Sequence, residues 1–348
     1  MRDALRHAAG PIGALALALL VSSFVMLAFH ANPIDAFGAL ARGAFGSKQG
    51  LAETLVQTTA LLFAGLGVAV AFRAGLFNIG AEGQLVAGGL CTAVAGAALH
   101  LPAVVEIPLC LVAGAIGGAI WGGIAGVLRA RFGASEVITT IMLNYIAFLG
   151  SSYLVSGPLR GDVSAPETAP IAATAVMAPI FANTRLTAAL PLALLLALFL
   201  WWWLGRTVAG YELRAVGKSE RAARYAGVDP RSVIERAMLM SGALAGLAGA
   251  TEVLGLLHRF NAELSPGYGF TSIAVALLGA TNPIGVILSA LFFGALQNGA
   301  LAMQSLAGVP KDLIAVVEGL VILFVAARKL PVGVNLLARR PARIEGDA

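Results

Sequence analysis

Charged side chains are scarce in this 348-residue sequence: they make up 12% of it, against 59% hydrophobic residues. A soluble domain carries about twice that charged fraction, so the composition excludes an ordinary soluble protein. Cys91 and Cys110 are the only cysteines, and both lie in apolar runs without metal-ligand spacing. We expect both to be core residues that form no disulfide. The four histidines are scattered over termini and loops, so the sequence predicts no metal site and no catalytic cluster.

A complete nucleotide-binding loop is also missing, although three residues of its sequence motif are present. Gly217-Lys218-Ser219 matches the end of the pattern G-x-x-x-x-G-K-[ST], whose first glycine lets the backbone curl around a phosphate. That first position is Glu212, which carries a side chain and the same sign of charge as a phosphate. The pattern should also follow a β-strand, yet the preceding residues read LALLLALFLWWWLGRTVAG. We therefore expect the chain itself to bind no nucleotide and no cofactor.

Long apolar runs are abundant instead. A membrane-spanning helix needs about 20 mostly apolar residues, and the 42 glycines favour close packing of helices in lipid. The sequence therefore predicts an all-α polytopic membrane protein with about ten transmembrane helices, some of them broken or re-entrant. They would form a single transmembrane domain over residues 1–348. The ten candidates lie near residues 11–30, 51–72, 80–99, 102–128, 134–156, 187–204, 233–257, 268–281, 283–303 and 311–327.

Positive charges indicate the orientation of these helices. If the N-terminus is cytoplasmic and the chain crosses ten times, 17 of the 23 Lys and Arg residues lie in cytoplasmic segments and only six lie outside. Five of the 17 follow residue 327. This asymmetry predicts that both termini are cytoplasmic. It also accounts for the net charge of +5, so no nucleic-acid partner is required.

Two long segments lie on the predicted outer side. Residues 157–186 are rich in Pro, Ala and Thr, and they form either a cap or partner surface or a disordered link. Residues 31–50 contain a candidate amphipathic helix. A solvated connector is the simpler alternative for both segments.

The predicted cytoplasmic loop, residues 205–232, carries helix start and stop signals. Ser219 is a candidate N-cap for a helix over residues 220–226, and Gly227 stands where a C-cap glycine belongs. Asp229 then caps a following helix that has proline in its first position. A loop that needs only positive charge requires no such signals. Docking of a cytoplasmic partner is therefore favoured over a solvated connector.

A glycine-rich break, residues 75–89, interrupts the apolar pattern. It places Asn78, Glu82 and Gln84 at the membrane boundary or deeper, where polar groups are costly and usually face a cavity or the bundle interior. Broken helices that line a path recur in transporters. These side chains therefore either line a translocation path or cap the broken helix and satisfy its backbone. The candidate path residues are Phe77, Asn78, Glu82, Gln84, Asn144, Tyr145 and Glu252.

Three stretches together resemble a known family. They are GLFNIGAEGQLVAGG at 75–89, GYELRAVGKSERAARYAGVDPRSVIERAMLMSGALAGLAGA at 210–250, and SPGYGFTSIAVALLGATNPIGVILSALFFGAL at 265–296. They are similar to the permease subunits of ATP-binding-cassette importers for simple sugars and nucleosides, within the branched-chain amino acid/ribose-type permease superfamily. The resemblance covers about residues 50–327. The family often has Asn where Ser219 stands, which exchanges one cap residue for another.

The resemblance implies a function. The chain would be a multi-pass permease of the bacterial inner membrane and not itself an enzyme. Its partners would be two cytoplasmic ATPase subunits or one tandem ATPase, a second permease in a homo- or heterodimer, and an extracytoplasmic substrate-binding protein. The short helix of the cytoplasmic loop would be the coupling helix, with a small apolar face. The residues implied in this contact are Ser219, Glu220, Ala222, Ala223, Arg224, Tyr225 and Gly227.

Within this resemblance, the motif NIGAEGQ at residues 78–84 favours nucleosides as the substrate, with simple sugars as the alternative. An ion-coupled secondary transporter or a channel would need paired intramembrane ionisable residues or a selectivity ring. Glu82 and Glu252 are too few and show no pairing in the sequence. A membrane enzyme would need a His, Asp or Cys constellation that the sequence does not show. The importer permease is therefore the favoured function.

Overall fold

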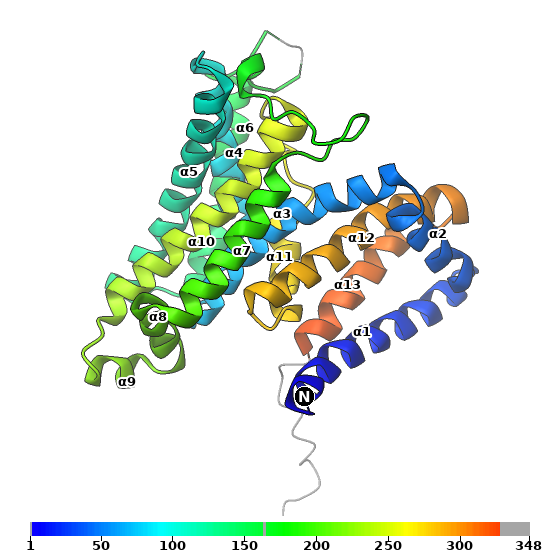
Figure 1. The fold of residues 1–348 in the computed structure, drawn as a ribbon, viewed down its shortest axis with the longest axis horizontal. Coiled ribbons are helices and arrows are strands. Elements are labelled where there is room, and N and C mark those ends of the chain that lie inside the picture. The colour runs from blue at the N-terminus through cyan, green and yellow to red at the C-terminus, as the bar shows by residue number, and fades with distance from the viewer. Residues whose placement is uncertain (1, 163–164, 328–348) are drawn as a thin grey trace, which may run out of the picture.

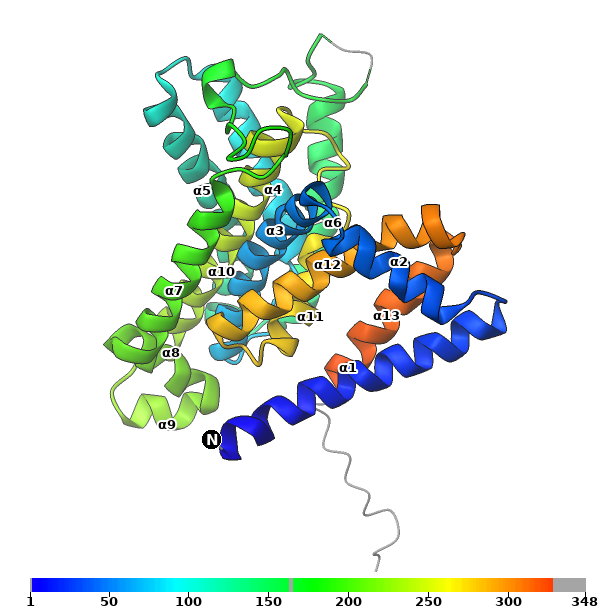
Figure 2. The same cartoon turned by 45° about the vertical axis from the view of Figure 1, so that its right-hand side comes forward.

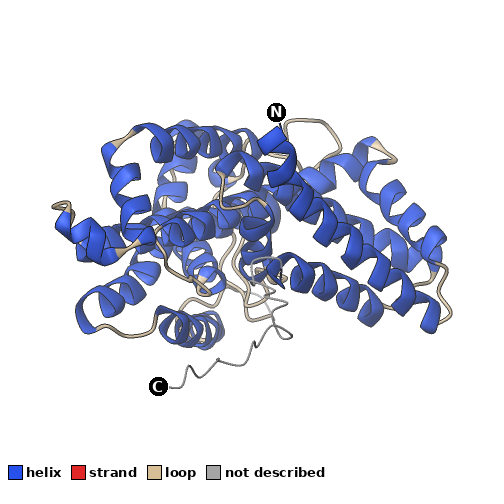
Figure 3. Ribbon diagram, turned by 90° about the horizontal axis from the view of Figure 1, so that it is seen from below, coloured by secondary structure: helices blue, strands red, loops and turns tan. Residues whose placement is uncertain are grey.

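The computed structural model describes residues 2–162 and 165–327, and the regular structure in these ranges is helical (Figure 3). They contain three isolated β-bridges and no β-strand. The predicted all-α fold is thereby confirmed for this part of the chain. In chain order the helices are α1 (Arg2–Ala28), α2 (Pro33–Phe45), α3 (Lys48–Arg73), α4 (Ala81–Ala98), α5 (Ala103–Phe132), α6 (Glu136–Ser156), the 3₁₀ helix η1 (Ala173–Ala175), α7 (Ala189–Arg206), α8 (Val208–Lys218), α9 (Glu220–Tyr225), α10 (Pro230–Glu252) with its π-helical continuation η2 (Val253–Leu257), α11 (Tyr268–Leu278), α12 (Pro283–Ala307) and α13 (Lys311–Ala327).

The helices form two groups with α3 between them (Figures 1 and 2). Helices α4–α7 and α10 make up one group, and α1, α2, α12 and α13 make up the other. Helix α3 packs against α10 of the first group and against α12 of the second. Its most apolar 18-residue window is 83% buried. Helix α3 is therefore mostly apolar, as expected for a helix that other helices cover on nearly all sides.

The two ends of the bundle differ in structure. Helices α8 and α9 lie at one end, here termed the α9 end, and the connection 157–188 lies at the opposite end, here termed the loop end (Figure 1). At the loop end, the Thr168 N–H donates to the Phe260 carbonyl at 2.9 Å, and Arg259 pairs with Glu167 at 3.0 Å. This part of the connection is therefore a cap on the residues that follow η2, and it is not a free link.

Helices occur at all ten positions that the sequence predicts. Counting only residues that the structure describes, six of them are long and apolar enough to cross a membrane: α3, α5, α6, α7, α10 with η2, and α12. Helix α11 has only 11 residues, about 16 Å, which is half of the about 30 Å hydrocarbon core. The count of ten crossings and the orientation of the termini stay predictions, and the five basic residues after position 327 lie outside the described residues. Helix α2 confirms a helix within residues 31–50.

The two cysteines have different environments. Cys110 on α5 is buried, as expected, whereas Cys91 on α4 is exposed, so that expectation was wrong. The neighbour of the Cys91 sulfur is Gly117 of α5. A glycine has no side chain with which to cover the sulfur.

Glycines bring α4, α5 and α10 into backbone contact. A methyl group added at Gly246 would meet the backbone of Gly114 and Gly118, and one added at Gly88 would meet the backbone of Gly246. Small residues permit such an approach in lipid, where helices gain no hydrophobic free energy by leaving water and depend on close packing. The contact of α10 with two neighbours therefore depends on residues that carry no side chain.

We expect Gly246→Ala to lower the free energy of unfolding by about 1–3 kcal/mol, because the added methyl group overlaps backbone atoms of α5. Thermal unfolding in detergent measures the effect. Gly150→Ala is the matched control, since Gly150 lies in α6 with open space around it, and alanine is the better helix former. Equal losses in the two variants would contradict the packing role of Gly246.

Candidate functional site

Two non-helical segments interrupt the helices and carry buried residues. One joins α3 to α4 over residues 74–80, and the other joins η2 to α11 over residues 258–267. Asn78 of the first segment contacts Ser241, which lies about 16 Å along α10 from its start at Pro230. Backbone groups at such depth have no bulk water to bind and need partners within the protein.

The Asn78 side chain is the centre of a buried hydrogen-bond cluster. Its Nδ2 donates to Gln84 Oε1 at 2.9 Å and to Ser241 Oγ at 2.8 Å. Its Oδ1 accepts from the Gly80 N–H at 2.9 Å and from Gln84 Nε2 at 3.1 Å. The cluster ties the segment before α4 to the first turn of α4 and to α10.

Asn144 of α6 supports the same break from another side. Its Oδ1 accepts from the Gly83 N–H at 2.8 Å, and its Nδ2 donates to the Ile79 carbonyl at 3.0 Å. The first N–H groups of a helix have no partner within the helix. Asn144 therefore caps α4 from a residue that is distant in the sequence.

Glu82 caps the second break. Its Oε2 accepts from the Gly269 N–H at 2.6 Å, in the first turn of α11. The Oγ of Ser265 accepts from the N–H groups of Gly267 and Tyr268 beside it. A carboxylate at the N-terminus of a helix is stabilised by the helix dipole and by the free N–H groups. Glu82 thus links the start of α4 to the start of the short helix α11.

Helix α11 is held at both ends by α3. At its N-terminal end, the Tyr268 hydroxyl donates to Gln57 Oε1 at 2.5 Å. At its C-terminal end, the Nε of Arg73 donates to the Thr281 carbonyl at 2.9 Å. Ala280 and Thr281 both have positive φ angles, 51° and 56°, so the turn after α11 is a strained one for side-chain-bearing residues. The contacts with α3 fix the position of this turn.

The structure places the predicted path residues in three settings. Asn78, Glu82, Gln84 and Asn144 are buried and come together around the breaks. Phe77 and Tyr145, their neighbours in the sequence, are 41% and 60% exposed on the surface of the chain. Glu252 is buried at the loop end, apart from this cluster, and has an electrostatic interaction with Arg185.

Ser241 also belongs to the Asn78 cluster, and Gln57 and Tyr268 form the contact between α3 and α11; the sequence analysis identified none of the three. Each lies in a mostly apolar segment, as many structural residues do. A polar residue in such a segment is a weak indication of a functional role, because packing between helices that are distant in the sequence determines its partners.

The loop between α8 and α10 has the predicted caps. Ser219 Oγ accepts from the Ala222 N–H at 3.2 Å, and Asp229 accepts from the N–H groups of Arg231 and Ser232. Gly227 follows α9 with φ of 84°, a left-handed conformation that favours glycine. The predicted helix start and stop signals are confirmed.

The small apolar face expected on α9 would consist of Ala222, Ala223 and Tyr225, and the structure exposes these residues unequally. Ala223 is only 3% exposed, whereas Tyr225 is 94% exposed and Ala222 is exposed too. Ala223 packs inward because α9 rests on α8 and α10. Ala222, Ala223 and Tyr225 therefore do not form one exposed apolar surface. One groove on α9 is lined by Glu220, Arg221, Arg224 and Tyr225, and a second groove, between α8 and α9, has Ala222, Ala223 and Ala226 in its lining.

Gly217, part of the Gly-Lys-Ser sequence, is in contact with the first break. A methyl group at Gly217 would meet the backbone of Arg73 and Ala74, and one at Gly75 would meet the backbone of Gly217. Glycine at 217 thus permits the end of α8 to touch the chain between α3 and α4. Through this contact, the loop with α9 is joined to the segment that carries Asn78.

These observations define a class: a helical membrane protein whose polar centre lies at helix breaks, in contact with a capped surface helix at one end. The sequence matches the family described as branched-chain amino acid transport system / permease component over residues 50–326. The chain belongs to this family.

Three relatives are similar over most of their length. The guanosine ABC transporter permease protein NupP of Bacillus subtilis (strain 168) is 40% identical over 93% of this chain and 94% of its own. The glucose ABC transporter permease protein TsgB13 of Haloferax volcanii is 36% identical over 90% of this chain and 86% of its own. The nucleoside ABC transporter permease protein NupB of Lactococcus lactis subsp. cremoris is 34% identical, over 94% and 93%. The chain is therefore a multi-pass inner-membrane permease subunit of an ATP-binding-cassette transporter.

His, Cys, Asp and Glu are side chains that commonly bind metal ions in proteins. Within the described ranges 2–162 and 165–327, no group of three or more of them lies together.

We expect Glu82→Ala to destabilise the start of α11, because the buried Gly269 N–H then has no acceptor. An unpaired buried donor costs about 1–3 kcal/mol. Hydrogen exchange of residues 265–278 in detergent should rise, together with a lower unfolding temperature. Glu82→Gln keeps an acceptor oxygen and is the matched control, with a smaller change. Unaltered exchange in Glu82→Ala would show that this cap is dispensable.

Proposed function

We propose that this chain forms the translocation path of an importer for nucleosides. The observation that carries the proposal is the 40% identity, over 93% of the chain, to a permease named for guanosine. A second candidate, a simple sugar, is favoured by the 36% identity to a permease named for glucose. A nucleoside contains a sugar ring, so substrates of both kinds present hydroxyl groups to the path.

In this proposal the α9 end faces the cytoplasm, together with both termini, and residues 1–348 form one permease domain. Helix α9 and its flanking residues dock on the ATPases, which are two subunits or one tandem protein. A second permease, identical or different, completes the path, and a binding protein delivers substrate at the loop end. The chain binds no ATP and no other cofactor. The capped α9 and the uneven distribution of Lys and Arg support this orientation.

Motion passes from the ATPases to the path through backbone contacts. ATP binding in the partner subunits moves α9, and α8 carries this movement to Gly217, which abuts the start of the first break. Asn78, Gln84 and Asn144 hold the break in shape, and Glu82 joins it to α11. The exposed Phe77 and Tyr145 then face the second permease and line the path with it.

Uptake in a strain that lacks the transporter tests the substrate. Cells that express the whole assembly should accumulate radiolabelled guanosine, and unlabelled adenosine or uridine should compete. Omission of this permease alone should abolish uptake. Uptake of glucose that nucleosides do not inhibit would assign the chain to the sugar alternative instead.

Docking at α9 is tested with the exposed Tyr225. We expect Tyr225→Ser to weaken ATPase binding by about 30-fold, since an anchoring tyrosine contributes about 2 kcal/mol to an interface. The affinity in detergent and the substrate-stimulated ATP hydrolysis measure the effect. The control is Tyr153→Ser. Tyr153 is also an exposed tyrosine, and it lies near the C-terminal end of α6 rather than on α9. Unchanged affinity in Tyr225→Ser would remove this residue from the contact. Ala223 is unsuitable for this test, because it is buried against the loop itself.

A further inference from the structure

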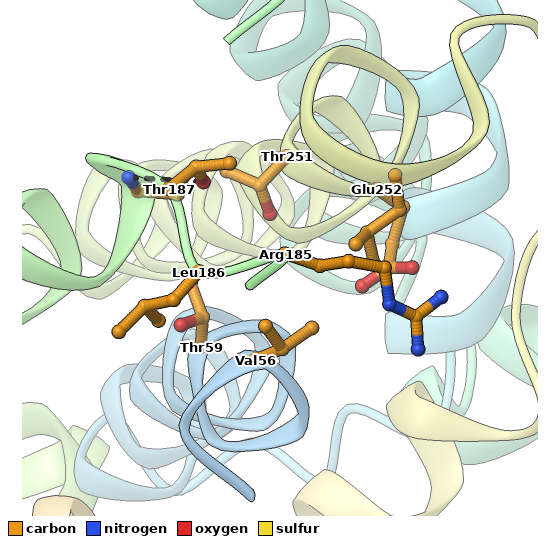
Figure 4. A pocket seen from close by; sticks show the side chains of 9 residues that line it. Val56, Thr59, Arg185, Leu186, Thr187, Thr251 and Glu252 are labelled. Carbon is orange, nitrogen blue, oxygen red and sulfur yellow. Dashed lines mark hydrogen bonds between the residues drawn. The ribbon is translucent and has the colours of Figure 1, made fainter. Parts of the chain in front are cut away.

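A small polar pocket lies at the loop end, where residues 185–189 cross between α3 and α10 (Figure 4). Its polar lining comes from Thr59 of α3, Thr251 and Glu252 of α10, and Arg185 and Thr187 of the crossing segment. The space between them is about 10 Å³, which is about enough for one water molecule. The pocket is therefore too narrow for a larger ligand in this conformation.

Glu252 has unused hydrogen-bonding capacity. Its side chain points toward this pocket, the residue is only 6% exposed, and its carboxylate accepts no hydrogen bond from the described residues. A buried carboxylate is costly unless it is paired or hydrogen-bonded. Arg185 has an electrostatic interaction with Glu252, but its hydrogen bonds go to Glu53. Both carboxylate oxygens are therefore free to accept hydrogen bonds from a ligand.

The neighbouring threonines add further acceptors. Thr59 donates its hydroxyl hydrogen to the Leu55 carbonyl at 2.8 Å, and Thr251 donates to the Ala248 carbonyl at 2.8 Å. Each hydroxyl has one hydrogen and two lone pairs, so it keeps its capacity as an acceptor. The pocket thus combines a carboxylate and two hydroxyl acceptors. Such a set fits a ligand rich in hydroxyl donors, as the acidic residue that binds a ribose diol in dinucleotide sites illustrates.

Arg185 lines the pocket at the loop end. Its Nε donates to Glu53 Oε1 at 2.9 Å, and a second guanidinium nitrogen donates to Glu53 Oε2. This bidentate pair joins the crossing segment to α3. The hydrogen bond to Glu53 is the main cause that raises the pKa of Arg185 above its ordinary value. The Arg185 side chain is partly exposed, so water can compete for it and the pair can open.

We propose that Glu252, Thr59 and Thr251 form a transient binding site for the sugar hydroxyl groups of the substrate, and that the Arg185–Glu53 pair is the latch that opens and closes it. The proposal rests on the proposed function and names where the sugar ring binds in the outer half of the path. A space of about one water molecule cannot hold a sugar ring, so substrate enters only when the latch opens and the pocket widens. Arg185 beside Glu252 disfavours a metal cation as the occupant.

The binding site is tested by the preference for the ribose diol. Transport of guanosine and of 2′,3′-dideoxyguanosine is compared in proteoliposomes that hold the whole assembly, with both ligands saturating the binding protein. We expect Glu252→Gln to lower guanosine transport about tenfold and to leave dideoxyguanosine transport unchanged, because only the diol uses the second acceptor oxygen. Thr59→Val keeps the side-chain shape, removes one acceptor and should reduce the preference in the same direction.

Glu106→Gln is the matched control for Glu252→Gln. Glu106 is also a buried carboxylate, its Oε2 accepts from the Leu101 N–H, and it does not line the pocket. Its substitution should keep the preference for the diol. Equal losses for both ligands in Glu252→Gln and Thr59→Val, or no loss, would overturn the proposal. So would transport that depends on Na⁺ in the wild type and not in Glu252→Gln. Absence of any nucleoside transport by the wild type would instead refute the proposed function.

The latch is tested without transport. Thr59→Cys, in a chain that also carries Cys91→Ser, places a thiol in the pocket; the remaining Cys110 is buried. The rate of its labelling by a membrane-impermeant thiol reagent, added to the outer side, reports opening. We expect Arg185→Gln to raise this rate about tenfold, the factor that a loss of about 1.4 kcal/mol gives. A double exchange, Arg185→Glu with Glu53→Arg, should restore slow labelling. Equal rates with and without Arg185 would contradict the latch.

Discussion

Backbone N–H and C=O groups that leave a helix inside a membrane protein must find partners within the protein, because hydrocarbon supplies none. Helix α3 ends at Arg73 and α4 begins only at Ala81, while α11 begins inside the bundle. Each start is capped by a side chain from another helix: Asn144 for α4 and Glu82 for α11. The relative positions of α4, α6 and α11 follow from this requirement, so the hydrogen bonds that satisfy the breaks also build the centre of the protein.

The same breaks are the places where a movement of α8 and α9 can reach the centre of the protein. Close backbone contacts between glycines make α4, α5 and α10 one packed unit, which has little freedom to deform. The segment before α4 is not part of a helix, and Gly217 at the end of α8 abuts its first residues. A displacement of α8 and α9 therefore reaches the break directly. The glycine of Gly217-Lys218-Ser219 is explained by the close contact of two backbone segments at that position. Phosphate binding is not needed to explain it.

Local features of the fold could be predicted from the sequence, and long-range ones could not. The caps Ser219 and Asp229 act on N–H groups two or three residues away, so residue type and spacing suffice to identify them. Asn78 and Ser241 are 163 residues apart, and Glu82 and Gly269 are 187 apart. No spacing rule reaches that far. The six-residue helix α9 is too short for periodicity to show which alanine is buried, and its packing on α8 and α10 decides that.

The buried polar residues differ in the hydrogen-bonding capacity that remains available for a substrate. Asn78 uses both hydrogens of Nδ2 and both lone pairs of Oδ1 on protein partners. A substrate could bind it only by displacing one of these bonds, and a buried group left unpaired costs about 1–3 kcal/mol. Glu252 keeps both oxygens free of such bonds beside a narrow pocket that a partly exposed ion pair borders. The hydrogen-bonding capacity that remains after the fold is satisfied therefore distinguishes residues that hold the path from residues that can contact what passes through it.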